Sequence, residues 1–219
     1  MIAFFDVDHT LINGNSGFYT SFRLVQHGIL KKRRILQALF YRFAGMLGYL
    51  NIKKIYDIVT SDMTGSKIDD ILEIGKECFE KDIKNKFYQE ALTLIKKHKQ
   101  KGDQIVLISS GPGMIIPFIK EYLQADDSYS ISSEIVNGIV SSKIPDPLCH
   151  AEGKIYYALK ACEKFSIPLN ECAFYTDHVS DIPLLEKVGK PFAVNPDYRL
   201  RKKALKKGWP ILNFKTTSA

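Results

Sequence analysis

Hydrophobic residues in this chain form several short continuous runs, separated by longer stretches in which they recur with helical spacing. The runs cover residues 2–5, 104–110, 172–176 and 191–194, and a further run, PILNF, covers residues 210–214. Apolar runs of this length, without polar alternation, are typical of strands that are buried on both faces. They predict an α/β fold in which helices cover both faces of a parallel sheet.

Helical spacing is clearest in three segments that flank the second and third runs. Each segment places apolar side chains three or four residues apart, which puts them on one face of a helix. These positions are Phe87, Ala91, Leu94, Ile95 and His98; Ile115, Phe118, Ile119, Tyr122 and Leu123; and Ile155, Leu159, Cys162 and Phe165. Residues 129–144 alternate weakly instead and contain Asn137-Gly138, which predicts a small hairpin.

The long interval between the first two runs, residues 16–86, also has helical periodicity, but it contains no segment typical of a strand. Within it, Ser66 is followed three residues later by Asp69, a pattern typical of a helix N-terminus. We therefore predict a helical cap that is inserted into the α/β domain. On this division residues 1–15 and 87–219 form the core, and residues 16–86 form the cap.

The composition is that of a globular protein, and no membrane-spanning helix is predicted. The most apolar segment, residues 35–50, contains Arg42 and is shorter than the roughly 20 residues that a span needs. Asp6 and Asp8 interrupt the apolar stretch at the N-terminus, so no signal peptide is predicted. The four cysteines show neither CxxC nor metal-ligand spacing, and we expect free thiols in a reducing cytoplasm.

Positive charge is concentrated in the N-terminal part of the chain. The formal net charge is +7, and residues 9–56 contain no Asp or Glu although they contain many Lys and Arg. A second basic cluster covers residues 199–207. Each basic run alone is compatible with a solvated helix face. A one-sided region of this length nevertheless creates a positive field that attracts anionic substrates, acidic lipids or nucleic acid.

Polar side chains follow the predicted strands at the points where the strands end. Asp6 and Asp8 follow the first run, Ser109 closes the second, and Asp177 follows the third. Because the carboxyl ends of parallel strands meet along one edge of a sheet, we expect these side chains to lie together. Two more groups join the predicted cluster, namely Lys154, just after a glycine, and Asp181.

Taken singly, each of these residues is explained by a turn, a helix cap or a solvated charge. Taken together, they have a shared chemistry. Carboxylates supply the oxygen ligands that Mg²⁺ prefers, while a serine hydroxyl and a lysine ammonium neutralise phosphoryl oxygens. The chain has no GxxxxGK[ST] sequence, so the cluster predicts a phosphoryl-transfer site without a P-loop.

With these motifs the chain resembles the haloacid dehalogenase superfamily, and within it the phosphoserine-phosphatase-like branch. The resemblance rests on DVDHT, the serine of LISSG, the lysine of GK and the acids of TDHVSD, in that order, and on DIPLLEKVGKPFAVNP near the C-terminal end. It covers essentially the whole chain, with residues 16–86 matched loosely. It implies a Rossmann-like core with a helical cap, Mg²⁺ as cofactor, and a small phosphomonoester rather than nucleic acid as partner.

The resemblance also implies roles for the first motif and for the metal. Asp6 would be the nucleophile that becomes an aspartyl-phosphate. Asp8 would protonate the leaving oxygen and then activate the hydrolytic water. Thr10 would help to position this loop at the phosphate. Asp6, Asp8 and Asp177 would hold Mg²⁺, with Asp8 binding through its main-chain carbonyl.

The remaining motifs would hold the phosphate. By the same resemblance, Ser109 and Lys154 would bind its oxygens, and Lys154 would also steady the nucleophile Asp6. Asp181 would act behind the metal or through Lys154.

The substrate prediction departs from the name of the branch. Phosphoserine phosphatases typically carry an acid shortly after the first motif for the substrate amine, whereas here LINGNSGFY follows and the next acid is Asp57. We therefore expect a small anionic or neutral phosphomonoester, with phosphoserine as an alternative. The basic, aromatic-rich residues 31–50 leave a further alternative, a lipid phosphate cleaved during peripheral contact with an acidic membrane, although packing within the cap explains that stretch as well. His9 and His178 are interpreted as loop residues, since every step already has a carboxylate.

Two other classes of protein remain. A DxD-dependent nucleotide-sugar transferase would use Asp6 and Asp8, but it would leave Ser109, Lys154 and the paired later acids without a role. A non-enzymatic module that binds a phosphorylated ligand would not need both Asp6 and Asp8.

Overall fold

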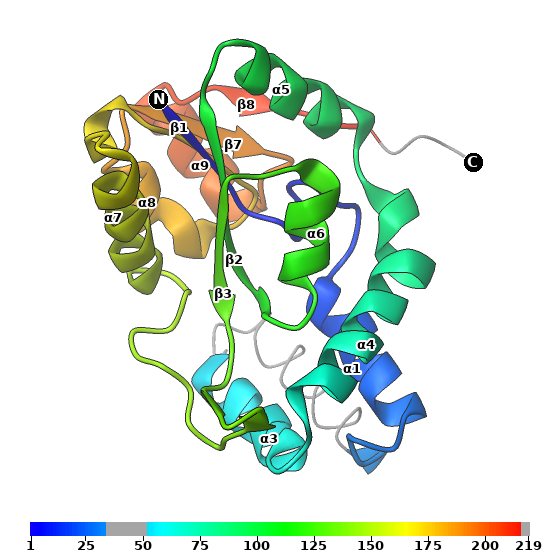
Figure 1. Ribbon diagram of the computed structural model, residues 1–219. Helices are drawn as coiled ribbons and strands as arrows, with labels where there is room; N and C mark the ends of the chain where they lie inside the picture. Colours follow the sequence, from blue (N-terminus) through cyan, green and yellow to red (C-terminus); the bar gives the residue numbers. More distant parts are fainter. Residues whose placement is uncertain (34–51, 216–219) are drawn as a thin grey trace.

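The computed structural model describes residues 1–33 and 52–215, and a six-stranded sheet lies at their centre. The strand order is β3-β2-β1-β6-β7-β8, and every neighbouring pair is parallel (Figure 1). This arrangement confirms the predicted α/β fold. The strands are β1 (Ile2–Phe5), β2 (Gln104–Pro112), β3 (Asp127–Ile131), β6 (Ala173–Thr176), β7 (Lys190–Val194) and β8 (Ile211–Leu212).

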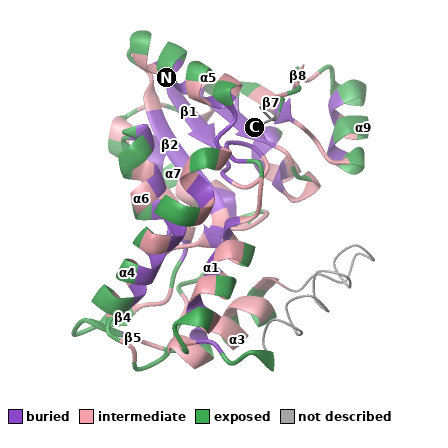
Figure 2. Ribbon diagram, turned by 90° about the vertical axis from the view of Figure 1, so that its right-hand side faces the viewer, coloured by how far each residue is buried: buried purple, intermediate pink, exposed green. Residues whose placement is uncertain are grey.

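Alternate residues of the central strand β1 supply the apolar cores on the two faces of the sheet. Ile2 and Phe4 pack with helices on one face, and Ala3 and Phe5 pack with helices on the other. All four are almost completely buried, within the purple centre of Figure 2. The first face is covered by α7 (Gly153–Phe165), α8 (Ile182–Leu185) and α9 (Tyr198–Lys207), and the second by α5 (Gln89–Gln100) and α6 (Ile116–Leu123). Packing on both faces fixes the direction in which the chain leaves β1.

Only β3, among the strands of this sheet, does not coincide with a predicted apolar run. Its sequence is DSYSI, and it lies at the edge of the sheet, where it pairs with β2 alone. Polar residues are tolerated at such an edge because their side chains reach partners or solvent. The Asp127 carboxylate accepts hydrogen bonds from Tyr129 at 3.1 Å and from Lys164 at 2.8 Å. Hydrophobic patterning alone therefore missed β3.

The predicted hairpin is present as β4 (Ile135–Val136) and β5 (Ile139–Val140), which pair in antiparallel fashion. Asn137 and Gly138 both have positive φ, 51° and 78°, as a two-residue type I′ turn requires. The hairpin is not part of the six-stranded sheet. Val140 accepts a hydrogen bond from the Gly65 N–H at 3.0 Å, and Gly138 accepts one from the Ile68 N–H at 2.9 Å. It thus pairs with the helical segment between β1 and β2.

That segment gathers beyond the carboxyl ends of the central strands (Figure 1). Its apolar faces form a cluster of their own, with Leu24, Ile71 and Ile74 buried in it and joined by Met114 and Val140. The elements of the segment are α1 (Ser16–Gln26), α3 (Ile52–Met63), α4 (Ile68–Cys78), a π-helical turn (Phe79–Ile83) and a 3₁₀ turn (Lys84–Lys86).

The prediction that Ser66 begins a helix is wrong. Helix α4 begins at Ile68, its N-cap residue is Lys67, and no side chain caps it. The Ser66 carbonyl instead accepts a hydrogen bond from the Val140 N–H at 3.0 Å. Pairing with the hairpin holds this stretch extended, and so the helix starts one residue later than the local pattern indicates.

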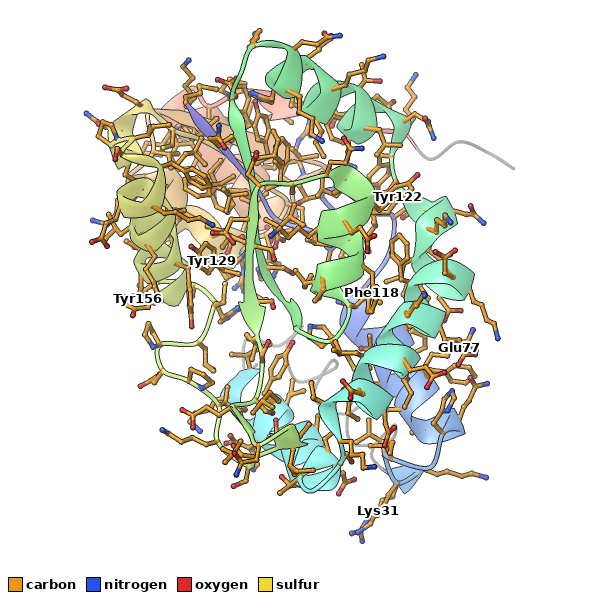
Figure 3. The ribbon with its side chains drawn as sticks, in the orientation of Figure 1. Lys31, Glu77, Phe118, Tyr122, Tyr129 and Tyr156 are labelled. Carbon is orange, nitrogen blue, oxygen red and sulfur yellow. The ribbon has the colours of Figure 1, made fainter. Side chains whose placement is uncertain are left out.

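Helix α4 lies against the main chain that follows β2. A Cβ atom placed on Gly75 would be 2.2 Å from the Met114 carbonyl oxygen, a distance that only glycine avoids. Farther along, Tyr122 of α6 packs its ring 5.6 Å from Phe79 and 5.1 Å from Phe87. Figure 3 shows Phe118 and Tyr122 on the side of α6 that faces these helical turns. The helical segment is therefore closely fitted to the sheet domain on this side.

The cysteines are free thiols, as predicted, and all four are buried: Cys78, Cys149, Cys162 and Cys172. Within the described parts of the chain, no helix combines the length and hydropathy needed to cross a membrane. Most of the basic, aromatic-rich stretch 31–50, on which the membrane-surface alternative rests, lies outside the described residues.

Candidate active site

The centre of the candidate site is a buried ion-pair cluster around Lys154. The Lys154 Nζ donates hydrogen bonds to Asp6 Oδ1 at 3.0 Å and to Asp181 Oδ2 at 2.7 Å. These three residues are only 7%, 1% and 1% exposed in the order Asp6, Lys154, Asp181. Thr176, the last residue of β6, also donates to Asp181 Oδ2, at 2.6 Å. Four polar groups thus meet in one place: Asp6 directly after β1, Lys154 on α7, Thr176 at the end of β6, and Asp181 in the 3₁₀ turn that follows.

The strands hold this cluster in position. The Asp6 N–H still donates to the Tyr175 carbonyl at 2.9 Å, which extends the pairing of β1 with β6 by one residue. The pKa of Lys154 is raised even though burial lowers it, because the charges of Asp181 and Asp6 outweigh that effect. Lys154 therefore stays a cation inside the protein.

Asp8 points toward the helical segment. Its carboxylate accepts hydrogen bonds from the Ser16 N–H at 2.8 Å and from the Ser16 hydroxyl at 3.1 Å. Burial raises the pKa of Asp8 to about 7, and these hydrogen bonds reduce the rise without cancelling it. Ser16 begins α1 and was not among the predicted site residues, although its place at the start of the inserted helices was the available signal.

Asp177 follows β6 and lies on the other side of the first motif. The Thr10 hydroxyl donates to Asp177 Oδ1 at 3.3 Å, which joins two of the predicted motifs directly. The pKa of Asp177 is raised well above its usual range by burial, and further by the charges of Asp6 and Asp181. Burial likewise raises the pKa of Asp6, although Lys154 opposes the rise.

These raised pKa values mean that the buried carboxylates are not fully compensated by one lysine. A bound cation would remove the imbalance. Within residues 1–33 and 52–215, no three Asp, Glu, His or Cys side chains are grouped closely enough to hold a metal ion by themselves. Mg²⁺ suits such a place, because it is commonly bound through one or two carboxylates together with water and substrate phosphate. The donor set here therefore fits Mg²⁺.

Ser109 and the glycine turn after it lie beside Asp8. Ser109 is 1% exposed, and its hydroxyl accepts a hydrogen bond from the Gly111 N–H at 2.9 Å. A Cβ atom on Gly111 would lie 3.0 Å from Ser109 Oγ, 2.6 Å from Ser16 Oγ and 3.8 Å from Asp8 Oδ2. Three polar side chains thus surround Gly111 so closely that a larger residue at this position would collide with Ser16 Oγ.

A tyrosine from the helical segment reaches the same turn. The Tyr56 hydroxyl, on α3, donates to the Ser110 carbonyl at 2.7 Å. Burial and the charge of Asp8 raise the pKa of Tyr56 well above its usual range, so that it remains a neutral donor. No sequence pattern marks Tyr56, because its partner is a main-chain atom far along the chain. His9 and His178 line the space in front of Asp8, as loop residues next to the motifs.

The fold and this cluster of polar residues agree with those of one family of hydrolases. A model of the haloacid dehalogenase-like hydrolase family matches residues 3–186, which include every predicted site residue. The chain belongs to the haloacid dehalogenase-like hydrolase family.

Relatives with assigned names agree with this membership. A protein of Streptomyces azureus called "Inhibition of morphological differentiation protein" is 31% identical, over 97% of this chain and 78% of its own length. Phosphoserine phosphatase SerB1 of Mycobacterium tuberculosis is 26% identical, over 97% of this chain and 70% of its own length.

Solved structures agree as well. A Bordetella pertussis protein of unknown function superposes with a TM-score of 0.86 at 23% identity, covering 96% of this chain and 97% of its own. A phospho-aspartyl intermediate analogue of phosphoserine phosphatase gives a TM-score of 0.66 at 20% identity, covering 98% and 93%. The chain is a phosphatase of this hydrolase family, which sets aside the nucleotide-sugar transferase and the non-enzymatic binder.

Proposed function

We propose that this chain is a Mg²⁺-dependent phosphomonoester phosphatase in which Asp6 is the nucleophile. The observation that carries the proposal is the buried contact of 3.0 Å between Lys154 Nζ and Asp6 Oδ1 at the end of β1. A carboxylate that attacks a phosphate dianion needs adjacent positive charge, and Lys154 supplies it where water is excluded. The solved phosphoserine phosphatase named for a phospho-aspartyl intermediate analogue has the same fold.

The first half of the reaction transfers the phosphoryl group to Asp6. A carboxylate oxygen of Asp6 forms a bond to phosphorus while the ester P–O bond breaks. The alcohol then leaves with a proton from Asp8. A carboxyl with a pKa of about 7 is protonated often enough near neutral pH to serve as this acid.

The second half releases the phosphate. Asp8, now a carboxylate, accepts a proton from a water molecule, and the water oxygen bonds to phosphorus as the bond to Asp6 breaks. Inorganic phosphate leaves, and both aspartates return to their starting states. The hydrogen bonds from Ser16 keep the Asp8 carboxylate directed toward the space where the alcohol and the water would lie.

The carboxylates of Asp6 and Asp177 and the main-chain carbonyl of Asp8 would hold Mg²⁺. This assignment agrees with the Asp8 side chain being engaged by Ser16. When bound, Mg²⁺ would offset the charge that accumulates on the phosphoryl oxygens. Thr10, through its contact with Asp177, would position one of these ligands.

Ser109 and Lys154 would bind the phosphoryl oxygens, since both lie beside the aspartates and both can donate hydrogen bonds. Asp181 would act through Lys154, which it contacts at 2.7 Å, and not on the substrate. With the Thr176 hydroxyl as a further donor to Asp181, the lysine is held in one orientation.

We assign residues 1–15 and 87–219 to a core domain and residues 16–86 to a cap. The separate apolar cluster of the inserted helices supports this division, although Met114 and Val140 of the core contribute to it. The four free thiols support a reducing compartment, the cytoplasm. The substrate would be a small phosphomonoester, for which the name of SerB1 offers phosphoserine as one candidate.

Phosphate release from a panel of monoesters tests the proposal. We expect turnover with Mg²⁺ and loss of turnover when EDTA removes it. Full activity in excess EDTA, or no hydrolysis of any monoester with Mg²⁺ present, would contradict the proposed function.

A further inference from the structure

A cavity of about 650 Å³ opens directly in front of Asp8. The glycine turn after β2 forms its inner end, and α1, α3, α4 and the β4–β5 hairpin form its walls. Its volume lies within the range of cavities that bind small molecules. The alcohol part of a phosphomonoester bound at Asp6 would extend into this space, because Asp8, the proposed acid for the leaving oxygen, lies in its lining.

The walls are apolar. Side chains from four different elements contribute to them, among them Phe22 of α1, Val59 of α3, Leu72 of α4 and Val140 of β5. The described residues that line the cavity include no Lys, Arg or Glu, and Asp8 is the one Asp among them. Apart from Asp8, which the proposed reaction uses as its acid, the described walls offer no carboxylate to the ammonium of phosphoserine and no Lys or Arg to its carboxylate. An unpaired charge is costly to move out of water.

Several hydroxyl groups along the walls already form hydrogen bonds within the protein. Thr20 donates to the Ser16 carbonyl at 2.9 Å, and Ser21 donates to the Gly17 carbonyl at 2.7 Å. Thr60 shares a hydrogen bond of 3.2 Å with Ser133. A substrate that needs a hydrogen bond from Thr20 or Ser21 would have to displace the bond that each already donates, whereas an apolar group would leave these bonds intact.

The outer end of the cavity exposes aromatic surface. Phe18 and Phe22, both lining residues on α1, are 50% and 46% exposed. Exposed aromatic side chains that border an apolar cavity gain free energy when an apolar ligand covers them. Apolar surface therefore continues from the neighbourhood of Asp8 to the opening.

We propose that this cavity binds an apolar chain of the substrate, so that the preferred substrate is an amphiphilic phosphomonoester with one aliphatic chain. The inference rests on the proposed phosphatase function and narrows it to a substrate class. The phosphoryl group lies at Asp6 and the chain lies along α1, α3 and α4. Binding energy from the chain then holds the ester in position for attack.

A series of alkyl phosphates, from ethyl to octyl and used as monomers in solution, tests the inference. Since each buried methylene contributes to binding, kcat/KM should rise about threefold to fourfold per added methylene until the cavity is filled. Octyl phosphate should also exceed phosphoserine. Mg²⁺-dependent hydrolysis with no dependence on chain length, or with phosphoserine preferred, would overturn the inference and leave the phosphatase function standing. No hydrolysis of any ester would overturn both.

Substitutions in the cavity walls test where the aliphatic chain of the substrate lies. Val59→Trp should fill part of the cavity and lower the ratio of kcat/KM for octyl phosphate to that for ethyl phosphate by about tenfold, as the loss of about two methylene contacts would do. Leu159→Trp is the matched control, because Leu159 is 51% exposed on α7 and does not line the cavity. Phe22→Ser, at a half-exposed position that tolerates substitution, should lower the same ratio. An unchanged ratio in both cavity variants would overturn the inference.

A further comparison tests whether the aliphatic chain belongs to a soluble amphiphile or to a lipid in a membrane surface. Dodecyl phosphate is offered in phosphatidylcholine vesicles, with and without acidic lipid, beside monomeric octyl phosphate. Preference for octyl phosphate in solution supports a free amphiphile, and hydrolysis that needs vesicles supports a lipid surface. If neither octyl phosphate in solution nor dodecyl phosphate in vesicles were hydrolysed with a higher kcat/KM than ethyl phosphate, the proposal that the cavity binds an aliphatic chain would be wrong.

Discussion

The Lys154 ammonium lies 3.0 Å from the Asp6 carboxylate although 148 residues separate the two along the chain. Asp181 holds the same ammonium from the other side, at 2.7 Å. One buried cation thus lies between two buried anions, at the point where β1 ends. Such an arrangement is most sensitive to the loss of its one cation, because both carboxylates then stay buried without a partner.

Lys154→Met should be strongly destabilising. It leaves Asp6 and Asp181 buried without their cation, and removing one partner of a buried pair typically costs about 3–5 kcal/mol. Urea denaturation measures the free energy of unfolding. The double variant Lys154→Met/Asp181→Asn removes one of the unpaired charges and should recover part of the loss. If the double variant were as unstable as the single one, charge imbalance would not be the cause.

Asp6→Asn should abolish phosphatase turnover and keep the fold. The amide cannot attack phosphorus, while Asp181 remains to pair with Lys154. Because burial disfavours the charged form of Asp6 and raises its pKa, loss of that charge should not lower stability. Phosphate release and thermal unfolding are measured on the same preparation. Near-normal turnover would remove Asp6 from the role of nucleophile.

Tyr56→Phe should weaken the attachment of α3 to the C-terminal end of β2, where Ser110 lies. The variant removes the hydrogen bond of 2.7 Å to the Ser110 carbonyl. One such bond is worth about 1 kcal/mol, which corresponds to a decrease of about fivefold in kcat/KM if the contact is needed for substrate binding. Tyr198→Phe is the matched control, since Tyr198 is 79% exposed on α9. Equal kinetics in the two variants would argue against this role of Tyr56.

Gly75→Ala should destabilise the protein although it lies within a helix. Helix propensity alone favours alanine over glycine by about 1 kcal/mol. The new Cβ, however, would lie 2.2 Å from the Met114 carbonyl oxygen, and overpacking of this kind costs about 1–3 kcal/mol. We expect the clash to outweigh the propensity and Tm to fall. A rise in Tm would mean that α4 can move away from the sheet domain without loss.

Acid should weaken the protein through Asp103. Burial raises the pKa of Asp103, but hydrogen bonds from His98 and from the N-terminal ammonium lower it by a larger amount. The net shift of the pKa is therefore downward. A carboxyl with a lowered pKa in the folded state contributes stability above its unfolded value, near 3.8, and loses it as the pH falls through the folded value. Urea midpoints between pH 5 and pH 2, in steps of about one unit, should therefore fall more steeply for the wild type than for Asp103→Asn. Parallel curves would exclude this contribution.

Hydrophobic patterning predicted the central strands well because those strands are buried on both faces and have no polar alternation to confuse them. It failed at β3, whose polar residues are tolerated at an edge, and at Ser66, where pairing with a distant hairpin overrides a local capping pattern. In both places the deciding interaction lies far away along the chain.

The charged members of the candidate site were predictable for a related reason. Asp6, Lys154 and Asp181 are groups that would be costly to bury without a purpose, and each stands next to a recognisable strand or helix end. Ser16 and Tyr56 were not predicted, because they act through hydrogen bonds that any serine or tyrosine could make. Their importance arises from where the fold places them.

The β4–β5 hairpin has a consequence for motion. Besides the two chain crossings at residues 15 and 87, it ties the helical segment to the sheet domain through hydrogen bonds from Gly65 to Val140 and from Ile68 to Gly138. A lid attached at two neighbouring points can rotate about them by a hinge motion. A third attachment, made by a different part of the chain, requires either that the hairpin travel with the lid or that these bonds break at each opening. In the proposed phosphatase, entry of the substrate and release of phosphate would therefore depend on the hairpin.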